Sequence, residues 1–195
     1  NYYLTADDWF DEAYKTGFRQ EYNVTATHVS GPSSFYASFG YLDNEGITAN
    51  SNYERITGRL KADSQLKSWL KVGANMSYTH YEANQLDEDG VSNSSGNVFA
   101  AATQVAPIYP LFIRDANGNV MVDAYGNTRY DYGDKENAGL ERPVYTSTNA
   151  LSDAILNTSA YEGNALNAVG FAEFRFLEDF KFTSTNTVNL DESRS

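Results

Sequence analysis

Several polar side chains in the middle of the sequence have the spacing of metal ligands. Asp115, Asn117 and Asn119 occupy the first, third and fifth positions that a calcium-binding loop uses. The pattern then departs from such a loop, because Val120 stands where glycine is expected and no glutamate follows at the required distance. We interpret this segment as a turn, with calcium binding as the alternative. The acidic residues 87–89 are interpreted as solvated loop, with cation binding as the alternative.

The sequence has no arrangement of residues that is typical of catalysis. The two histidines, His28 and His80, are far apart and fall near strand ends on apolar faces, where packing or an interfacial role is favoured over chemistry. No Ser/His/Asp set with recognisable spacing and no phosphate-binding glycine loop is present. The 26 acidic residues form so many carboxylate pairs that no single pair is informative. We therefore predict no enzyme activity, no metal site and no cofactor.

Aromatic side chains are the remaining candidates for ligand contact. Six of them fall in a long predicted loop, residues 84–158, where they have no lipid to face. Packing within the loop and contact with a substrate fit them equally well. The predicted substrate contacts are Phe99, Tyr109, Phe112, Tyr125, Tyr130 and Tyr132.

A second aromatic group lies at or beside predicted strand ends. It consists of Trp9, Tyr41, Trp69, Tyr78 and Tyr81. These side chains suit either the aromatic girdle of a membrane interface or a surface that stacks on carbohydrate. The girdle is favoured for Trp69, Tyr41 and Tyr78.

The elements that carry these groups are predicted to be strands. Residues 23–42 hold two alternating runs joined by a short Gly/Pro/Ser turn, with one face apolar and aromatic and the other small and polar. The same period of two recurs over 53–63 and 69–80, and a third pair, 166–176 and 180–190, alternates less cleanly. Such faces fit a transmembrane β-barrel with lipid outside and a wet lumen inside.

Composition excludes several classes of protein. The net charge of −12 over 195 residues argues against a nucleic-acid partner. With no cysteine, a disulfide framework and a Cys-ligated zinc site are both impossible. No apolar run approaches the length of a spanning helix, but a spanning strand needs only about 9–11 residues with every second one apolar.

The links between the predicted strands alternate strictly between short and long. In transmembrane barrels the short turns lie on the periplasmic side and the long loops lie outside the cell. We therefore expect residues 1–17 to be the end of an extracellular loop, and residues 18–195 to be barrel with a long extracellular loop at 84–158. The short links are predicted at 30–34, 63–68 and 177–179, and the long ones at 43–52 and 84–158.

The long links are predicted to contain local structure. Residues 5–16 have the pattern of a short helix that Thr5 or Asp7 could cap. Residues 95–105 predict a second short helix. Two similar turns, at 115–119 and 123–127, predict a small hairpin around the strand NVMV.

Six strands do not close a pore-sized barrel, and an open sheet edge is not viable in lipid. We therefore expect the chain to be a piece of a longer protein that supplies further strands. The predicted fold class is all-β, an antiparallel transmembrane β-barrel segment of about six strands with long extracellular loops.

The order and spacing of several segments carry a family resemblance. DDWFDEAYKTG, EYNVTATHVSG, FYASFGYLDNEGI, NYERITGRLKAD and WLKVGANMSYT resemble the barrel region of SusC/RagA-type TonB-dependent outer-membrane transporters of Bacteroidetes-like bacteria. DANGNVMVDAYGN and NAVGFAEFRFLEDFKFTSTNTV are also similar, so the resemblance spans nearly the whole chain.

The resemblance implies a location in the outer membrane of a Gram-negative bacterium and a large barrel plugged by an N-terminal domain. It implies import of a bulky glycan or peptide, with energy relayed by TonB and a SusD-like surface lipoprotein that caps the barrel. No TonB box or plug sequence lies within these 195 residues, so no energy-coupling residue is assigned. The alternative is a soluble surface carbohydrate-binding or adhesion β-domain made of two packed sheets. The regular alternation of links favours the barrel.

Overall fold

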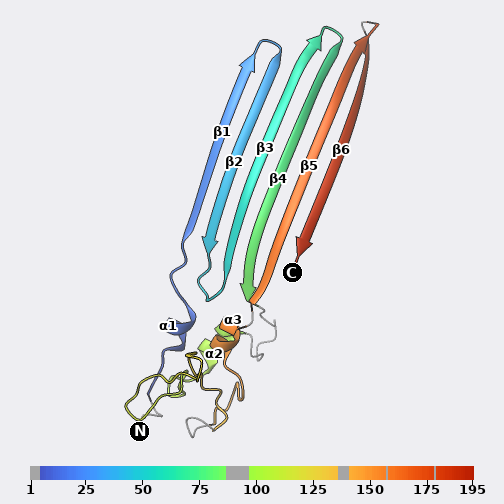
Figure 1. Cartoon of the computed structure of the whole chain (residues 1–195). Coiled ribbons are helices and arrows are strands. Elements are labelled where there is room, and N and C mark those ends of the chain that lie inside the picture. Colours follow the sequence, from blue (N-terminus) through green and yellow to red (C-terminus); the bar gives the residue numbers. More distant parts are fainter. Residues whose placement is uncertain (1–4, 87–96, 136–140, 157, 178) are drawn as a thin grey trace. The chain divides into compact units, whose positions relative to one another are not determined.

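The computed structural model describes residues 5–86, 97–135, 141–156, 158–177 and 179–195. The six strands in these residues form one antiparallel sheet, in which each strand lies beside its neighbours in the sequence (Figure 1). This confirms the predicted antiparallel all-β fold. The strands are β1 (Arg19–Ser30), β2 (Ser33–Glu45), β3 (Asn52–Lys67), β4 (Leu70–Leu86), β5 (Thr158–Phe176) and β6 (Phe180–Arg194).

Short turns join the strands in pairs at one end of the sheet. Gly31 occupies the left-handed region (φ 54°) in the β1–β2 turn, a conformation that suits glycine. The β3–β4 turn lies at Ser68 and Trp69, since β3 continues to Lys67. The predicted link at 63–68 is therefore wrong. Its polar residues had the composition of a turn, but their backbones continue the ladder with β4 through an irregularity between Gln65 and Lys67.

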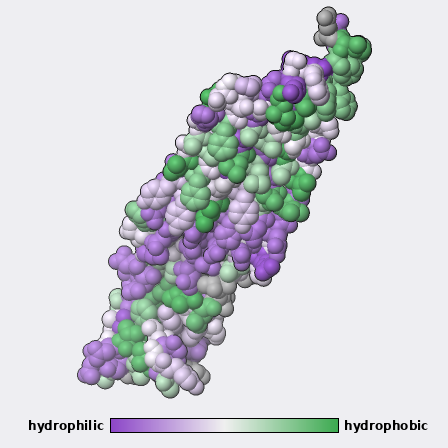
Figure 2. All heavy atoms as spheres, turned by 45° about the horizontal axis from the view of Figure 1, so that its top comes forward, coloured by the Kyte–Doolittle hydropathy of each residue, from purple (hydrophilic) through white to green (hydrophobic). Residues whose placement is uncertain are grey.

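The strand register gathers the two kinds of side chain onto opposite faces, as the alternation predicted. From β1 to β4 the apolar rows are Tyr22–Tyr41–Ile56–His80, Val24–Phe39–Gly58–Tyr78, Ala26–Ala37–Leu60–Met76 and His28–Phe35–Ala62–Ala74. The polar rows between them include Asn23–Gly40–Thr57–Thr79, Thr25–Ser38–Arg59–Ser77 and Thr27–Tyr36–Lys61–Asn75. Figure 2 shows apolar side chains in patches among polar ones on the surface of the molecule.

The register also assigns faces to the last two strands, which the sequence left open. Leu166 pairs with Leu190, Ala168 with Val188, and Phe174 with Phe182. These residues share one face, together with Asn164, whose side chain meets that of Tyr78 from the apolar face of β4. The apolar face therefore continues across β5 and β6.

The chain divides into two compact units. The sheet unit comprises Phe18–Glu45, Asn52–Asn84 and Ala160–Ser195, and the loop unit comprises Asn1–Gly17, Gly46–Ser51 and Gln85–Ser159. Apart from Leu42, the buried apolar side chains of the described residues all belong to the loop unit. The sheet therefore has no hydrophobic core of its own on either face.

In the described part of the loop unit lie three short helices: α1 (Trp9–Ala13), α2 (Val98–Gln104) and α3 (Ala150–Leu156). The predicted helices at 5–16 and 95–105 are present but shorter, and α3 was not predicted. The cap of α1 is Asp8, whose carboxylate accepts hydrogen bonds from the Phe10 and Asp11 amides, so the predicted caps Thr5 and Asp7 are wrong. None of the described helices is long and apolar enough to cross a membrane.

Candidate functional site

Three separate segments of the chain build the loop unit. They are the segment before β1, the β2–β3 link and the β4–β5 link, all of which leave the same end of an antiparallel sheet. The Lys15 amide donates a hydrogen bond to Ile47 O over 2.7 Å, which joins the first segment to the second. The Asn50 side chain donates to Ile155 O over 3.0 Å, which joins the second to the third. The long links thus form one body.

Trp9 lies at the centre of this body. It is 5% exposed, and its indole N–H donates to Tyr109 O over 3.1 Å. The guanidinium of Arg142 lies 5.3 Å from its ring centre. Because Trp9 is a core residue, neither of its predicted roles, girdle or sugar platform, is correct. The core around it consists of Ala13, Val98, Ala101, Ala102, Val105, Leu111, Ala150, Leu151 and Ala154.

Asp7 fastens the first segment to the long loop. Its carboxylate accepts two hydrogen bonds from Arg114, over 2.9 and 2.5 Å, and a third from the Leu111 amide over 2.7 Å. Burial raises the pKa of Asp7, but the Arg114 and Leu111 hydrogen bonds and the Arg114 charge outweigh it, so this pKa lies below its ordinary value. Asp7 is therefore ionised and joins the first segment to the long loop, and it does not cap α1.

A small closed ring of backbone hydrogen bonds organises the middle of the loop. Ile113, Met121 and Arg129 are eight residues apart, and each amide donates to another member: Ile113 to Arg129, Met121 to Ile113, and Arg129 to Met121, over 2.8–3.0 Å. The predicted hairpin around NVMV is thus part of a three-segment unit, with bridges at Arg114–Val120, Val122–Thr128 and Phe112–Tyr130.

Two equivalent turns connect the segments of this ring. In the first, Asp115 accepts hydrogen bonds from the Asn117 and Asn119 amides and from the Asn119 side chain, over 2.8–3.1 Å. Asp123 does the same in the second turn. These hydrogen bonds, from the Asn119 side chain and the Asn127 amide foremost, lower the pKa of both carboxyls. The contacts confirm the interpretation of residues 115–119 as a turn, in which the Asp115 carboxylate accepts hydrogen bonds from the turn's own amide groups.

An open groove of about 700 Å³ runs along the loop unit beside this ring. Two of the six predicted contact residues, Tyr130 and Tyr132, line it, and the Tyr132 hydroxyl lies 3.0 Å from that of buried Ser152. Burial raises the pKa of the Tyr130 phenol. The groove thus combines aromatic, aliphatic and charged groups. Its other lining residues are Ile113, Asp123, Asn127, Thr128, Arg129, Asp134, Ile155 and Leu156.

The other four predicted contact residues lie elsewhere in the loop unit. Tyr109 and Phe112 pack against the core, as Tyr130 does, and the Phe112 and Tyr130 rings are 5.6 Å apart. Phe99 is 60% exposed and Tyr125 90% exposed. Tyr125 projects from the second turn, whose Asp123 and Asn127 line the groove. The structure therefore groups Tyr125, Tyr130 and Tyr132 around the groove.

Sequence reasoning missed a buried polar network in the loop unit. Arg142 is 2% exposed and donates to Asp131 O over 3.1 Å and to Thr148 O over 2.5 Å. Asn149 donates to Asp131 O over 2.9 Å. Burial raises the pKa of the Asp131 carboxyl above its ordinary value, against the opposing effects of the Gly133 amide and of Arg142. No local sequence signal distinguishes these residues from solvated loop residues.

The histidines lie on the apolar face of the sheet unit. His28 is exposed, while the His80 Nδ1 lies 2.9 Å from Asn164 Oδ1 and its Nε2 lies 3.3 Å from Glu82. The acidic residues 87–89, considered as a cation site, fall outside the described part of the chain.

An aromatic belt follows the short-turn end of the apolar face. The ring centres of Trp69 and Phe174 are 6.4 Å apart, and those of Phe174 and Phe182 are 6.3 Å apart. The rings of Phe176 and Phe180 stack with their centres 5.8 Å apart. Tyr41 and Tyr78 lie on the same face nearer the other end. Tyr81 is different, because its register places it on the polar face, against Gly163. A belt of this kind is typical of the membrane interface.

Comparisons with known proteins agree on one architecture. No family model matches the sequence. The chain is 27% identical over 188 residues to TonB-dependent receptor P3 of Formosa agariphila, which covers 92% of this chain and 17% of the relative. It is 24% identical to TonB-dependent receptor P26 of the same organism, over 94% of this chain and 18% of the relative.

Solved structures match over the same extent. The fold superimposes on the RagAB peptide transporter with a TM-score of 0.68 and 24% identity, over 96% of this chain and 19% of the matched chain. An open-open state of the RagAB peptide importer gives a TM-score of 0.69. In sequence and fold the chain resembles a barrel segment of a SusC/RagA-type TonB-dependent receptor. It spans less than a fifth of the length of these relatives.

The resemblance to the TonB-dependent receptors explains the two faces of the sheet. These receptors are outer-membrane β-barrels, so the apolar face is the outward face that meets lipid and the polar face lines the lumen. The soluble two-sheet alternative is wrong, because the described strands all belong to one sheet that matches a barrel wall.

Proposed function

We propose that this chain forms part of the wall and outer mouth of a transporter that imports a bulky nutrient, a glycan or a peptide. The mechanism is binding at the mouth followed by passage through the lumen, with no chemistry on the substrate, so the protein is not an enzyme. The observation that carries the proposal is the joining of the segment before β1 and the two long links into one structured body that bears an aromatic groove.

The loop unit is proposed to face the outside of the cell. Two of its segments are the long links and the third leads into β1 at the same end of the sheet, and barrels of this class keep their long loops extracellular. In this orientation residues 1–17 end an extracellular loop, residues 18–195 supply barrel wall, and the loop at 84–158 lies at the mouth. The short turns then lie in the periplasm.

The groove lined by Tyr130 and Tyr132 is the proposed place of substrate contact. Tyrosine rings stack on sugars and on peptide side chains, and Arg129 and Asp134 add charged groups to the lining. Tyr125 and Phe99 extend this surface as exposed rings, and Tyr109 and Phe112 support it from the core. The groove is open, as contact with a large substrate requires.

A SusD-like surface lipoprotein is the proposed partner at the mouth. The matched RagAB structures are described as a peptide transporter, and a lipoprotein lid is what the resemblance implies. Phe10 and Phe99 form an exposed aromatic pair, with ring centres 6.5 Å apart, that suits such a contact. TonB would act through a plug region that this chain does not contain.

The test is growth of the native bacterium with the full-length gene deleted and then restored, on peptides or on glycans as sole carbon source. Restoration with Tyr125→Ala or with Leu156→Glu, both at exposed positions near the groove, should slow growth on the transported class. Ile108→Ala, exposed but outside the groove, is the matched control. The proposal would be contradicted if the deletion strain and the strains with folded variant barrels all grew unchanged on every peptide and glycan.

A further inference from the structure

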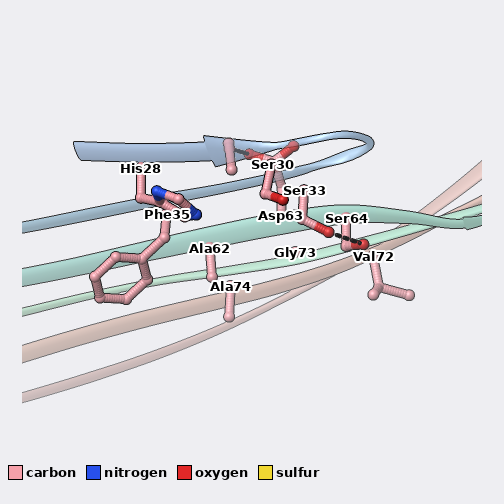
Figure 3. Close-up of a pocket in the computed structure, with 11 residues that line it drawn as sticks. His28, Ser30, Ser33, Phe35, Ala62, Asp63, Ser64, Val72, Gly73 and Ala74 are labelled. Atoms are coloured by element: carbon pink, nitrogen blue, oxygen red, sulfur yellow. Dashed lines mark hydrogen bonds between the residues drawn. The ribbon is translucent and has the colours of Figure 1, made fainter.

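The outward face of the sheet has a hollow near its short-turn end. It measures about 520 Å³ and lies over β1–β4, between Phe35 and Val72 (Figure 3). Ala62 and Ala74 form its floor, and a row of serines bounds it on the side of the turns. Nothing in the loop unit lines it.

The hollow exists because small side chains occupy consecutive outward positions. Ala62 and Ala74 pair directly across β3 and β4, and Ser33 and Ser64 pair across β2 and β3 one row closer to the turns. At the same depth β5 carries Ala172, which lies beside Val72, and the rings of Phe174 and Phe182 lie one row closer to the turns. The aromatic belt, from Trp69 to Phe174 and Phe182, therefore lies closer to the turns than the hollow and leaves it open.

The turn side of the hollow is polar. The hydroxyls of Ser33 and Ser64 lie 2.7 Å apart, with Ser30 beside them and His28 on the adjoining row. Lys67, which is exposed, pairs in register with Leu70 at the end of β3, on the strand that carries Ser64. Hydroxyl and ammonium groups at this position can donate hydrogen bonds to a phosphate.

We propose that this hollow holds one phospholipid of the leaflet at the short-turn end. One acyl chain lies over Ala62 and Ala74 beside the ring of Phe35, and the phosphate meets the serine row and Lys67. The outward face of a barrel is already in contact with lipid, so an acyl chain reaches the hollow directly. An unfilled hollow would forfeit the dispersion contacts of its lining, which a fitted chain restores.

The choice of a phospholipid rests on the proposed orientation. With the short turns in the periplasm, the hollow lies in the periplasmic leaflet. Lipopolysaccharide would be the expected lipid if the orientation were reversed. The identity of the retained lipid therefore reports on the orientation, whereas the growth test above reports on transport, so the two proposals fail separately.

The experiment uses the full-length receptor, purified from its own outer membrane in mild detergent, and counts retained lipids by native mass spectrometry. The wild type should retain one phospholipid through washing. Ala62→Phe and Ala74→Phe, which fill the hollow, should lose it. Ser184→Phe, on the outward face of β6 and at a similar distance from the turns, is the matched control and should retain it.

Heat-modifiability on gels checks that every variant is folded. Ser33→Ala with Ser64→Ala, which adds no bulk, should lower retention several-fold by removing hydrogen-bond donors to the headgroup. Equal retention in the wild type and the filled variants would overturn the proposal. So would a wild type that retains no lipid, or one that retains lipopolysaccharide or another protein at this surface.

Discussion

Asp7 and Arg114 form a two-bonded ion pair across 107 residues of sequence, with side chains only 7% and 11% exposed. The pair joins the segment that leads into β1 to the long β4–β5 loop. The Leu111 amide donates to the same carboxylate, so the pair also fixes the loop backbone. Loss of either partner would leave the other charge buried without its counterion.

Asp7→Asn should therefore loosen the loop around Leu111. Removing one partner of a buried ion pair costs about 3–5 kcal/mol, and 3 kcal/mol corresponds to roughly a hundredfold in local opening. Hydrogen exchange of residues 109–114 in the full-length receptor should accelerate by about this factor. Asp8→Asn, which keeps an acceptor at the cap of α1, is the control. Equal exchange in both variants would show that the pair contributes nothing.

Acid should have the same effect as the Asp7 substitution. The folded pKa of Asp7 lies below its unfolded value of about 3.9, so its stabilisation is complete above that pH and is lost as the pH falls through the lowered pKa. Exchange at residues 109–114, corrected for the intrinsic pH effect, should stay constant from pH 7 to pH 5 and rise only in stronger acid. A rise already between pH 7 and pH 5 would be inconsistent with this assignment.

Gly73 permits close packing on the lumen face. A Cβ at this position would lie 2.3 Å from the ring of Phe171 and 2.9 Å from Asp63 Cβ. Gly73→Ala should cost about 1–3 kcal/mol through overpacking, seen as a lower temperature of heat-modification. Phe171→Leu in the same chain should recover part of the loss.

Gly58→Ala is the matched control for that substitution. Gly58 lies on the neighbouring strand β3, where an added Cβ would meet nothing within 4 Å. It should therefore be neutral or slightly stabilising. The same loss at both glycines would mean that the β4–β5 contact does not exist as described.

Arginine should be tolerated on one face of the wall only. Leu60 lies in the middle of β3 on the outward face, where an arginine near the bilayer midplane costs about 2–4 kcal/mol. Leu60→Arg should reduce the yield of heat-modifiable barrel, whereas Thr79→Arg, on the lumen face of β4, should not. Val72, which shares the outward face, lies close to the β3–β4 turn and should show a smaller loss.

The wall of this protein was predictable from sequence because its pattern is local. Alternation such as that of Ile56, Leu60 and Ala62 assigns a face without knowledge of any partner strand, and the register confirms it. The β3–β4 turn was misplaced because polar residues such as Asp63 and Ser64 belong equally to turns and to the interfacial end of a strand.

The loop unit was far less predictable, because its order depends on contacts distant in sequence. Asp7 has the local pattern of a helix cap, and only its contact with Arg114 reveals its actual role. Trp9 resembles a girdle residue until its burial is known. The six aromatic residues of the long loop were correctly placed in that loop, but their division between core and groove depends on tertiary packing.

The central claim is that one face of the sheet meets lipid and the other lines a watery lumen. Single cysteines introduced one at a time at residues 57–62 of the full-length receptor, spin-labelled in outer membranes, test it most directly. Oxygen, which concentrates in lipid, should relax labels at Gly58, Leu60 and Ala62, whereas a water-soluble nickel complex should relax those at Thr57, Arg59 and Lys61. Equal access of the nickel complex to all six positions would contradict the account.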